Sequence, residues 1–280
     1  MIPPLPDLHL TVLRHGSRDS WKANAAGNRM NSQQELDVRA RVEADFHDAR
    51  INDEDEDRLG YAYVSVADVY EFGAVPDECL DRTVLEIGCF RGDQALALRG
   101  FCGRYVGIDI SPAAIEHCKQ LGLPGGFEFQ VDDANVLDSM ADGTVDYAFG
   151  HGVLHHLDLP RFAPALARKL SNRGFARFVE PAQGNMLLRA FRKLTPHLRT
   201  PDEYPFDHAA IALLRRHFDV RISYQALVRP YAPMLCLNNK AVIRASRWVD
   251  DRLLRHRIFQ DQAWLLQIEL RKRQDVARAA

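Results

Sequence analysis

The chain has 280 residues, of which 46% are hydrophobic and 26% are charged, and its formal net charge at pH 7 is −2. This length fits one core domain with additions, and the composition supports a sizeable buried core. The small net charge and the scattered basic residues argue against a protein that binds nucleic acid.

The cysteines and the apolar segments indicate the cellular compartment of the protein. The five cysteines have neither paired spacing nor histidines at metal-ligand intervals, which predicts reduced thiols and no metal site. No apolar run approaches the roughly 18 residues of a membrane span, and residues 1–6 do not resemble a signal peptide. These features predict a cytoplasmic protein that binds no membrane and is a monomer or a homodimer.

Residues 1–78 are expected to form an N-terminal arm and a helical segment before the core domain. Residues 1–31 show no sustained periodicity. A helix is then predicted to begin at Ser32, because Ser32 and Glu35 have the spacing of a capping box. Apolar residues follow at helical spacing: Val38, Val42, Phe46 and Ala49.

A short apolar strand and a glycine turn are predicted to open the core domain, residues 79–280. The run 83–87 suits a buried parallel strand, and Gly88 and Gly92 allow a tight turn that approaches a ligand closely. A helix that begins near Gly92 would direct its free N–H groups at that ligand. Because the carboxylate of Glu86 would repel a pyrophosphate, a ligand with an ammonium and a sulfonium group fits better.

Four further strands are predicted at 105–110, 127–131, 145–150 and 175–179, and a helix is predicted to begin at Ser111-Pro112. The spacing from Glu86 to Asp109 matches the gap of roughly 20 residues that, in nucleotide-binding α/β proteins, places an acidic side chain at the ribose hydroxyls of the ligand. Further along, a helix over 206–217, strands over 220–228 and 264–270 and a helix over 240–259 are expected. The alternation predicts a doubly wound α/β fold with a mostly parallel sheet.

The segment from Cys79 to Leu227 resembles the class I S-adenosylmethionine (SAM) dependent methyltransferases, of the type that acts on small molecules such as natural products and sugars. The resemblance implies a seven-stranded Rossmann-like sheet and SAM as cofactor. It also implies a set of cofactor-binding residues, which are Glu86, Gly88, Cys89, Phe90, Gly92, Asp109, Ile110, Asp133, Ala134, Gly150 and His151.

The resemblance assigns these residues to different parts of SAM. The glycine turn would hold the amino acid end, and Asp109 would hold the ribose hydroxyls. Asp133 would accept from the adenine amino group, with the backbone of Ala134 beside the ring. Gly150 and His151 would line the methionine end.

Phe90 departs from the family, which usually has a third glycine at this place. In one interpretation the turn tolerates a side chain that is directed away from the ligand. In the other, Phe90 reshapes the methionine pocket or stacks near the reacting centre.

The helix that begins at Ser32 also has two interpretations. In this family, helices before the first strand often close over the SAM pocket as a lid, which would exclude water from the reaction. Alternatively, the apolar stripe only packs on the flank of the sheet.

The expected catalytic residues follow the fourth and fifth strands. Methyl transfer to a hydroxyl group requires that the two reactants are aligned and that the hydroxyl loses its proton. Histidine is suited to accept that proton. In methyltransferases that act on natural-product and sugar hydroxyls, a Leu-His-His segment resembles Leu154-His155-His156, with an acid where Glu180 stands. His155 is the leading base, with His156 as second candidate and Glu180 as partner or substrate ligand; a packing role for the histidines is the alternative.

Two substrate-side insertions are expected near 181–205 and 229–260. The first resembles an Arg-Thr-Pro-Asp-Glu stretch of some bacterial small-molecule methyltransferases, so Arg199 and Glu203 are substrate candidates, unless they only pair with each other. Tyr61 and Tyr63 are further candidates. The second insertion could line the pocket or a dimer contact.

The sequence thus predicts a SAM-dependent methyltransferase that acts on a small molecule, at an oxygen atom, in specialised metabolism. Two alternatives stay open. The first is a SAM-binding enzyme that cyclises or rearranges its substrate, and the second is an NAD-dependent oxidoreductase, against which Glu86 and Asp133 argue.

Overall fold

The computed structural model describes residues 32–51, 80–182, 184–186, 189–190, 193, 206, 208–231 and 240–273. The chain divides into two compact units, Met1–Arg39 and Ala40–Ala280. The described part of the first unit is the beginning of helix α1 (Ser32–Arg50), which starts at the predicted capping box.

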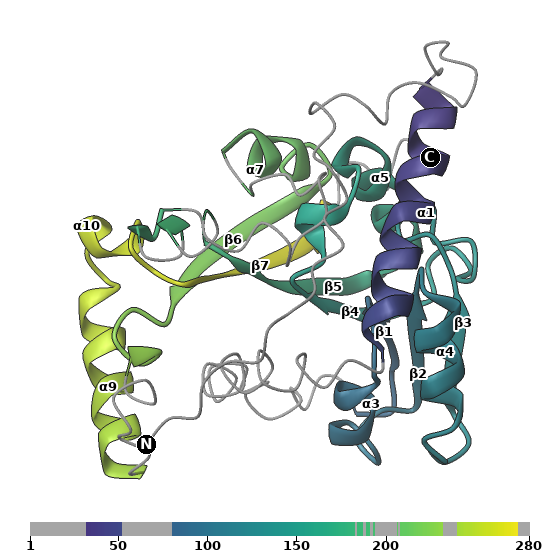
Figure 1. Ribbon diagram of the computed structural model, residues 1–280, viewed down its shortest axis with the longest axis horizontal. Helices are drawn as coiled ribbons and strands as arrows, with labels where there is room; N and C mark the ends of the chain where they lie inside the picture. Colours follow the sequence, from purple (N-terminus) through teal and green to yellow (C-terminus); the bar gives the residue numbers. More distant parts are fainter. Residues whose placement is uncertain are drawn as a thin grey trace, which may run out of the picture. The chain divides into compact units, whose positions relative to one another are not determined.

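The second unit is built on one seven-stranded sheet with the order β3-β2-β1-β4-β5-β7-β6, which can be followed in Figure 1. The strands are β1 (Thr83–Ile87), β2 (Arg104–Asp109), β3 (Phe127–Val131), β4 (Val145–His151), β5 (Leu170–Pro181), β6 (Phe218–Gln225) and β7 (Leu265–Lys272). The strands β3, β2, β1, β4 and β5 pair in parallel, and β7 runs antiparallel to both of its neighbours. The predicted doubly wound, mostly parallel fold is confirmed.

Helices bury both faces of this sheet. Leu85 and Ile87 of β1 join one apolar cluster with Phe162 of α5 (Leu159–Lys169) and Leu214 of α7 (His208–Leu214). Val84 joins a second cluster with residues of α3 (Asp93–Ala97) and α4 (Pro112–Lys119). Burial on both sides is why the parallel strands read as continuous apolar runs.

The start of α4 forms as the sequence predicts. Ser111 is the N-cap, and its hydroxyl accepts a hydrogen bond from the backbone N–H of Ala114 at 3.0 Å, while Pro112 occupies the first turn. The cap fixes the backbone that follows Asp109, which is a candidate site residue.

Several boundaries differ from the predictions. The strand β5 begins five residues earlier than expected, because Leu170 pairs with Val145 and the Ser171 hydroxyl donates to the Asp146 carboxylate at 2.9 Å. The predicted helix over 240–259 is two helices, α9 (Lys240–Leu253) and α10 (Arg257–Gln260), because His256 has an extended backbone and interrupts it. The helix α7 and the strand β6 also begin and end at other residues than the predicted ones.

The part of α1 in the second unit buries a polar face. Val42 is 39% exposed and Ala49 is also exposed, whereas Glu43 is only 7% exposed. The predicted apolar stripe is therefore not the face that packs at these positions. The reason is that α1 lies against polar loops of the candidate site, where carboxylate and imidazole groups find partners.

None of the described helices combines the length and the apolar character that a membrane span requires. No membrane-spanning element was expected from the sequence.

Gly150 at the end of β4 is packed so closely that a side chain would displace backbone. A Cβ atom there would lie 2.7 Å from the Ile87 carbonyl oxygen and 2.7 Å from Cγ1 of Val153. We expect Gly150→Ala to lower the melting temperature by roughly 5 to 10 °C, because overpacking against backbone costs about 2 to 3 kcal/mol. The control is Gly125→Ala, where a Cβ atom meets no atom within 4 Å. Equal melting temperatures of the two variants would contradict the packing at Gly150.

Candidate functional site

The candidate site lies where the parallel strands end. Because the carboxyl ends of parallel strands meet at one edge of the sheet, loops far apart in sequence come together there. The structure places the predicted cofactor residues on four of these ends, with Glu86, Gly88, Cys89, Phe90 and Gly92 at β1, Asp109 and Ile110 at β2, Asp133 and Ala134 after β3, and Gly150 and His151 at β4.

The glycine turn after β1 is held against β2. The backbone N–H groups of Gly88 and Cys89 both donate to the Ile108 carbonyl, at 2.9 and 3.0 Å. Gly88 and Gly92 have φ values of 74° and 75°, in the left-handed region that favours glycine. The turn therefore has the backbone that the sequence predicts for close approach to a ligand.

Phe90 also has a left-handed backbone, with φ of 39°. A large side chain in this region is strained, so the turn keeps a glycine-type conformation without the glycine. The Phe90 ring lies 5.9 Å from the His47 ring and 5.5 Å from the Arg91 guanidinium carbon. The side chain that replaces the family's third glycine is thus a contact surface for α1.

Asp109 joins two loops of the site. Its carboxylate accepts from the backbone N–H of Phe90 and from that of Ser111, each at 2.9 Å, and the residue is 7% exposed. A carboxylate held by two backbone N–H groups is a fixed acceptor. Its predicted contact with ribose hydroxyls stays a prediction.

Glu86 is buried beside Tyr105, a residue that the sequence did not mark as important. The Tyr105 hydroxyl donates to the Glu86 carboxylate, and Glu86 is 3% exposed. Burial raises the pKa of Glu86 well above its ordinary value, although the tyrosine hydrogen bond opposes this shift. The same hydrogen bond shows that the carboxylate already has a partner inside the sheet.

The raised pKa of Glu86 has a consequence for stability. Folded protein holds the Glu86 proton more tightly than unfolded protein does, so this group destabilises the fold increasingly as the pH rises above about 4.5. We expect Glu86→Gln to unfold at higher urea concentration than wild type at pH 8, with a difference that shrinks toward pH 4.5. Glu116→Gln, on the exposed side of α4, serves as control and should show no such trend.

Asp133 is held by a neighbour that the sequence did not single out. Its Oδ1 accepts from the backbone N–H of Asn135 at 2.9 Å and from the Asn135 side-chain amide at 2.8 Å. The Asn135 oxygen in turn accepts from the backbone N–H of Asp158 at 2.8 Å. This chain of bonds links the loop after β3 to the start of α5.

Glu180 and His155 form a buried pair behind the ends of β4 and β5. His155 lies on a short 3₁₀ helix, η3 (Leu154–His156), and its Nδ1 is 2.7 Å from Oε2 of Glu180. The other Glu180 oxygen accepts from the backbone N–H groups of Val153 and Leu154, at 3.0 and 2.8 Å. Glu180 is fully buried, so it fixes both the loop backbone and the imidazole.

The geometry also determines which ring nitrogen of His155 is basic. A carboxylate oxygen at hydrogen-bond distance favours a proton on Nδ1. In neutral His155 the lone pair is then on Nε2, the nitrogen suited to accept a proton. This arrangement is the one that a histidine general base requires.

His156 and α1 add a second group of polar residues. His156 Nδ1 is 3.3 Å from Oε1 of Glu43, and the other Glu43 oxygen is 3.8 Å from Nε2 of His47. The rings of His155 and His156 are 4.1 Å apart. Neither Glu43 nor His47 was a candidate from sequence, since both lie far from the strand motifs in the chain.

His151 lies at the end of β4, where the sequence predicts it. Burial lowers its pKa to about 4, against a smaller opposing effect of Glu180. His151 is therefore neutral at pH 7.

The remaining candidates lie outside the described residues: Tyr61, Tyr63, Arg199 and Glu203. Within the described ranges no group of three or more histidine, cysteine or acidic side chains could hold a metal ion.

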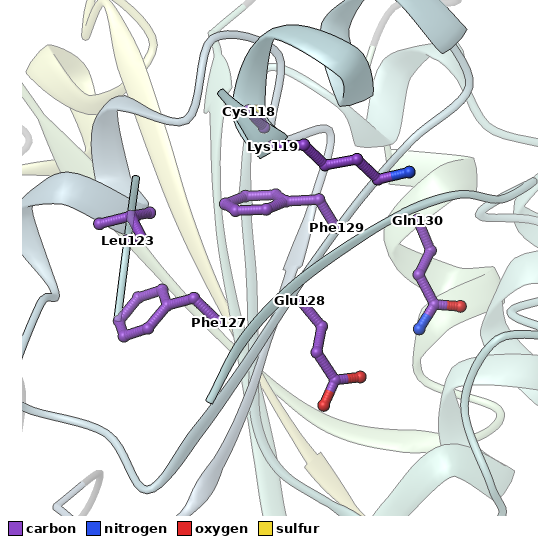
Figure 2. A pocket seen from close by; sticks show the side chains of 7 residues that line it. All are labelled: Cys118, Lys119, Leu123, Phe127, Glu128, Phe129 and Gln130. Carbon is purple, nitrogen blue, oxygen red and sulfur yellow. The ribbon is translucent and has the colours of Figure 1, made fainter. Parts of the chain in front are cut away.

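A cavity of about 390 Å³ lies elsewhere, at the edge strand β3. Figure 2 shows Phe127 and Phe129 directed to one side of this strand, with Glu128 and Gln130 on the other. The lining contains none of the candidate residues. The Sγ of its lining residue Cys118 donates to the Phe90 carbonyl at 3.1 Å, so the cavity lies next to the glycine turn without including its residues.

Comparison with known proteins defines the class of the site. Residues 85–178 match a family described as a methyltransferase domain. No curated protein gives a significant match.

Solved structures resemble the chain over most of its length. A Haloferax volcanii protein described as a putative methyltransferase, solved with the Trm112 methyltransferase activator, has a TM-score of 0.57 and 19% identity, over 80% of this chain and 96% of its own. Geranyl diphosphate C-methyltransferase from Streptomyces coelicolor has a TM-score of 0.54 and 14% identity, over 75% of this chain and 76% of its own. A SAM-dependent methyltransferase from Archaeoglobus fulgidus has a TM-score of 0.53 and 19% identity, over 75% of this chain and 93% of its own. At these identities the likeness establishes the fold.

The domain match and the fold lead to one enzyme class. Residues 85–178 match a methyltransferase domain, and the fold is that of SAM-dependent methyltransferases of known structure. The protein is thus a SAM-dependent methyltransferase by class, and its cofactor is SAM.

Proposed function

We propose that the protein transfers a methyl group from SAM to a hydroxyl oxygen of a small molecule, with His155 as general base. The pair formed by His155 and the fully buried Glu180 carries this proposal, because it leaves a basic Nε2 at the edge of the sheet where the cofactor residues gather. The acceptor's hydroxyl proton would move to that nitrogen as the oxygen bonds to the methyl carbon.

The residues present fit SAM. A turn with two left-handed glycines allows close backbone approach, and the fixed Asp109 carboxylate can accept from hydroxyl groups. The neutral, buried His151 adds no positive charge near a sulfonium. When bound, SAM supplies an activated methyl group, so the protein has to orient both reactants, exclude water and accept a proton.

The positions within the site follow from this assignment. We place the amino acid end at Glu86, Gly88 and Gly92, the ribose at Asp109 and the adenine amino group at Asp133. The Tyr105 hydroxyl, which already donates to Glu86, would hold that carboxylate in place.

The acceptor is proposed to be small, with no nucleic acid or membrane involved and with the protein as monomer or homodimer. Similar folds serve other acceptors: the Streptomyces coelicolor enzyme is a C-methyltransferase, and a Haemonchus contortus neighbour is named a phosphoethanolamine N-methyltransferase. The His155–Glu180 pair favours oxygen, because a hydroxyl must lose its proton during transfer.

The test uses SAM with a labelled methyl group and a panel of sugar and phenolic hydroxyl compounds, together with amine compounds and transfer RNA. We expect label on an acceptor oxygen, measured by mass spectrometry, and formation of S-adenosylhomocysteine. Label on an amine or on RNA would overturn the oxygen assignment, and consumption of substrate without label transfer would favour a cyclase or rearrangement. Calorimetry should show binding of SAM and none of NADH.

A further inference from the structure

A carboxylate from α1 lies beside the proposed base, outside every strand motif. Glu43 is 7% exposed, and its Oε1 is 3.3 Å from His156 Nδ1. The same side chain has its second oxygen 3.8 Å from His47 Nε2. A buried carboxylate between two imidazoles is a costly arrangement unless the rings give it partners.

We infer that Glu43 is a positioning residue of the reaction, which acts by orienting His156 against the ring of His155. The inference rests on the proposed function, since His155 is there the base. Glu43 and His156 then repeat the arrangement of Glu180 and His155, at 3.3 Å instead of 2.7 Å.

The closeness of the two rings, which are tilted by 40°, explains why the orientation of His156 matters. The ring centroids of His155 and His156 are 4.1 Å apart. Two imidazolium ions at this distance would repel strongly, so a proton on one ring opposes a proton on the other. His155 therefore accepts the substrate proton most readily while His156 is neutral.

Glu43 influences the state of His156 in two ways. As a hydrogen-bond acceptor it favours Nδ1–H in the neutral ring, which leaves the lone pair on Nε2. As a negative charge it raises the affinity of His156 for a proton, so that His156 must lose that proton before His155 can react.

Several charged and titratable groups act on the same ring. Glu43 and His47 face it from α1, and His155 faces it from η3. Glu180 lies behind His155, and Asp109 and Arg50 act on His47. Burial lowers the pKa of His47, so this ring is neutral at pH 7 and leaves the Glu43 charge available to His156.

The test measures the state of His156 directly, by nitrogen-15 NMR of the histidine side chains. In wild-type protein we expect neutral His156 as the Nδ1–H tautomer. In Glu43→Gln we expect His156 to take up its proton only at lower pH than in wild type, because the negative charge beside it is gone. Asp45→Asn changes the same charge on an exposed position of α1 and should leave His156 unchanged. An Nε2–H tautomer in wild type, or equal His156 titration in both variants, would overturn the inference.

A kinetic measurement separates positioning from mere support of the fold. In Glu43→Gln, whose amide oxygen can still accept from His156 Nδ1–H, we expect the acid limb of kcat to move to lower pH. In Glu43→Ala, which removes that acceptor, we expect kcat to fall about tenfold. The SAM KM should stay unchanged in both variants. Loss of activity with an unmoved acid limb would mean a structural role only. If wild-type protein transfers no methyl group, the proposed function fails while the NMR result still decides the Glu43–His156 contact.

Discussion

Replacement of His155 by alanine is expected to lower kcat about 100-fold or more, because general-base catalysis contributes at least this much. The SAM dissociation constant should stay within threefold of wild type, since His155 lies on η3 and outside the glycine turn. Single-turnover transfer of labelled methyl groups measures the first quantity, and calorimetry measures the second.

His156→Ala is the matched comparison, because it removes the neighbouring ring from the same short helix. We expect a smaller loss, of about tenfold, since His156 acts through His155. A near-wild-type rate for His155→Ala would reassign that ring to packing. A larger loss for His156→Ala than for His155→Ala would make His156 the base.

Glu180→Gln is expected to reduce kcat about 100-fold while the protein stays folded. The glutamine oxygen can still accept from the Val153 and Leu154 N–H groups, which Glu180 binds at 3.0 and 2.8 Å. The glutamine NH₂ would then face Nδ1 of His155 and donate to it. This forces the proton of neutral His155 onto Nε2, the nitrogen that must accept, and a wrong tautomer of this kind is costly in other His–carboxylate sites.

The control for this variant is Glu269→Gln, which also removes a carboxylate from the sheet. Glu269 pairs with Arg177 and Arg271 and not with His155. Melting temperatures should show that both variants fold. Turnover of Glu180→Gln within threefold of Glu269→Gln would show that the tautomer of His155 does not limit the reaction.

Local chemistry made much of the fold predictable. Some features depend only on residues that are close together in the chain, so the sequence alone predicts them. They are the alternating strands and helices, the glycine turn and the Ser111-Pro112 cap. The acids at the strand ends were predictable for a related reason. In a parallel sheet, the end of every strand reaches the same edge, and hence Glu86, Asp109 and Glu180 could be expected together.

The partners of these acids were not predictable. Tyr105 reaches Glu86 because Glu86 pairs with Gly107, which has no side chain to intervene, and this register is a property of the assembled sheet. Glu43 meets His156 across 113 residues of chain. The apolar stripe of α1 was misleading, because periodicity shows which residues share a face and cannot show that a neighbouring, polar face is the one that packs.

Residues toward the end of α1 contact three loops of the candidate site. Arg91 donates to the backbone carbonyls of Arg50 and Ile51, Asp48 accepts from the backbone N–H of Ala113, and Glu43 contacts His156. A shift of α1 would break all of these contacts together, so we expect the order of the turns after β1, β2 and β4 to be coupled through α1. Amide hydrogen exchange in these turns should accordingly proceed at one common opening rate, and any ligand that orders one turn would slow exchange in the other two.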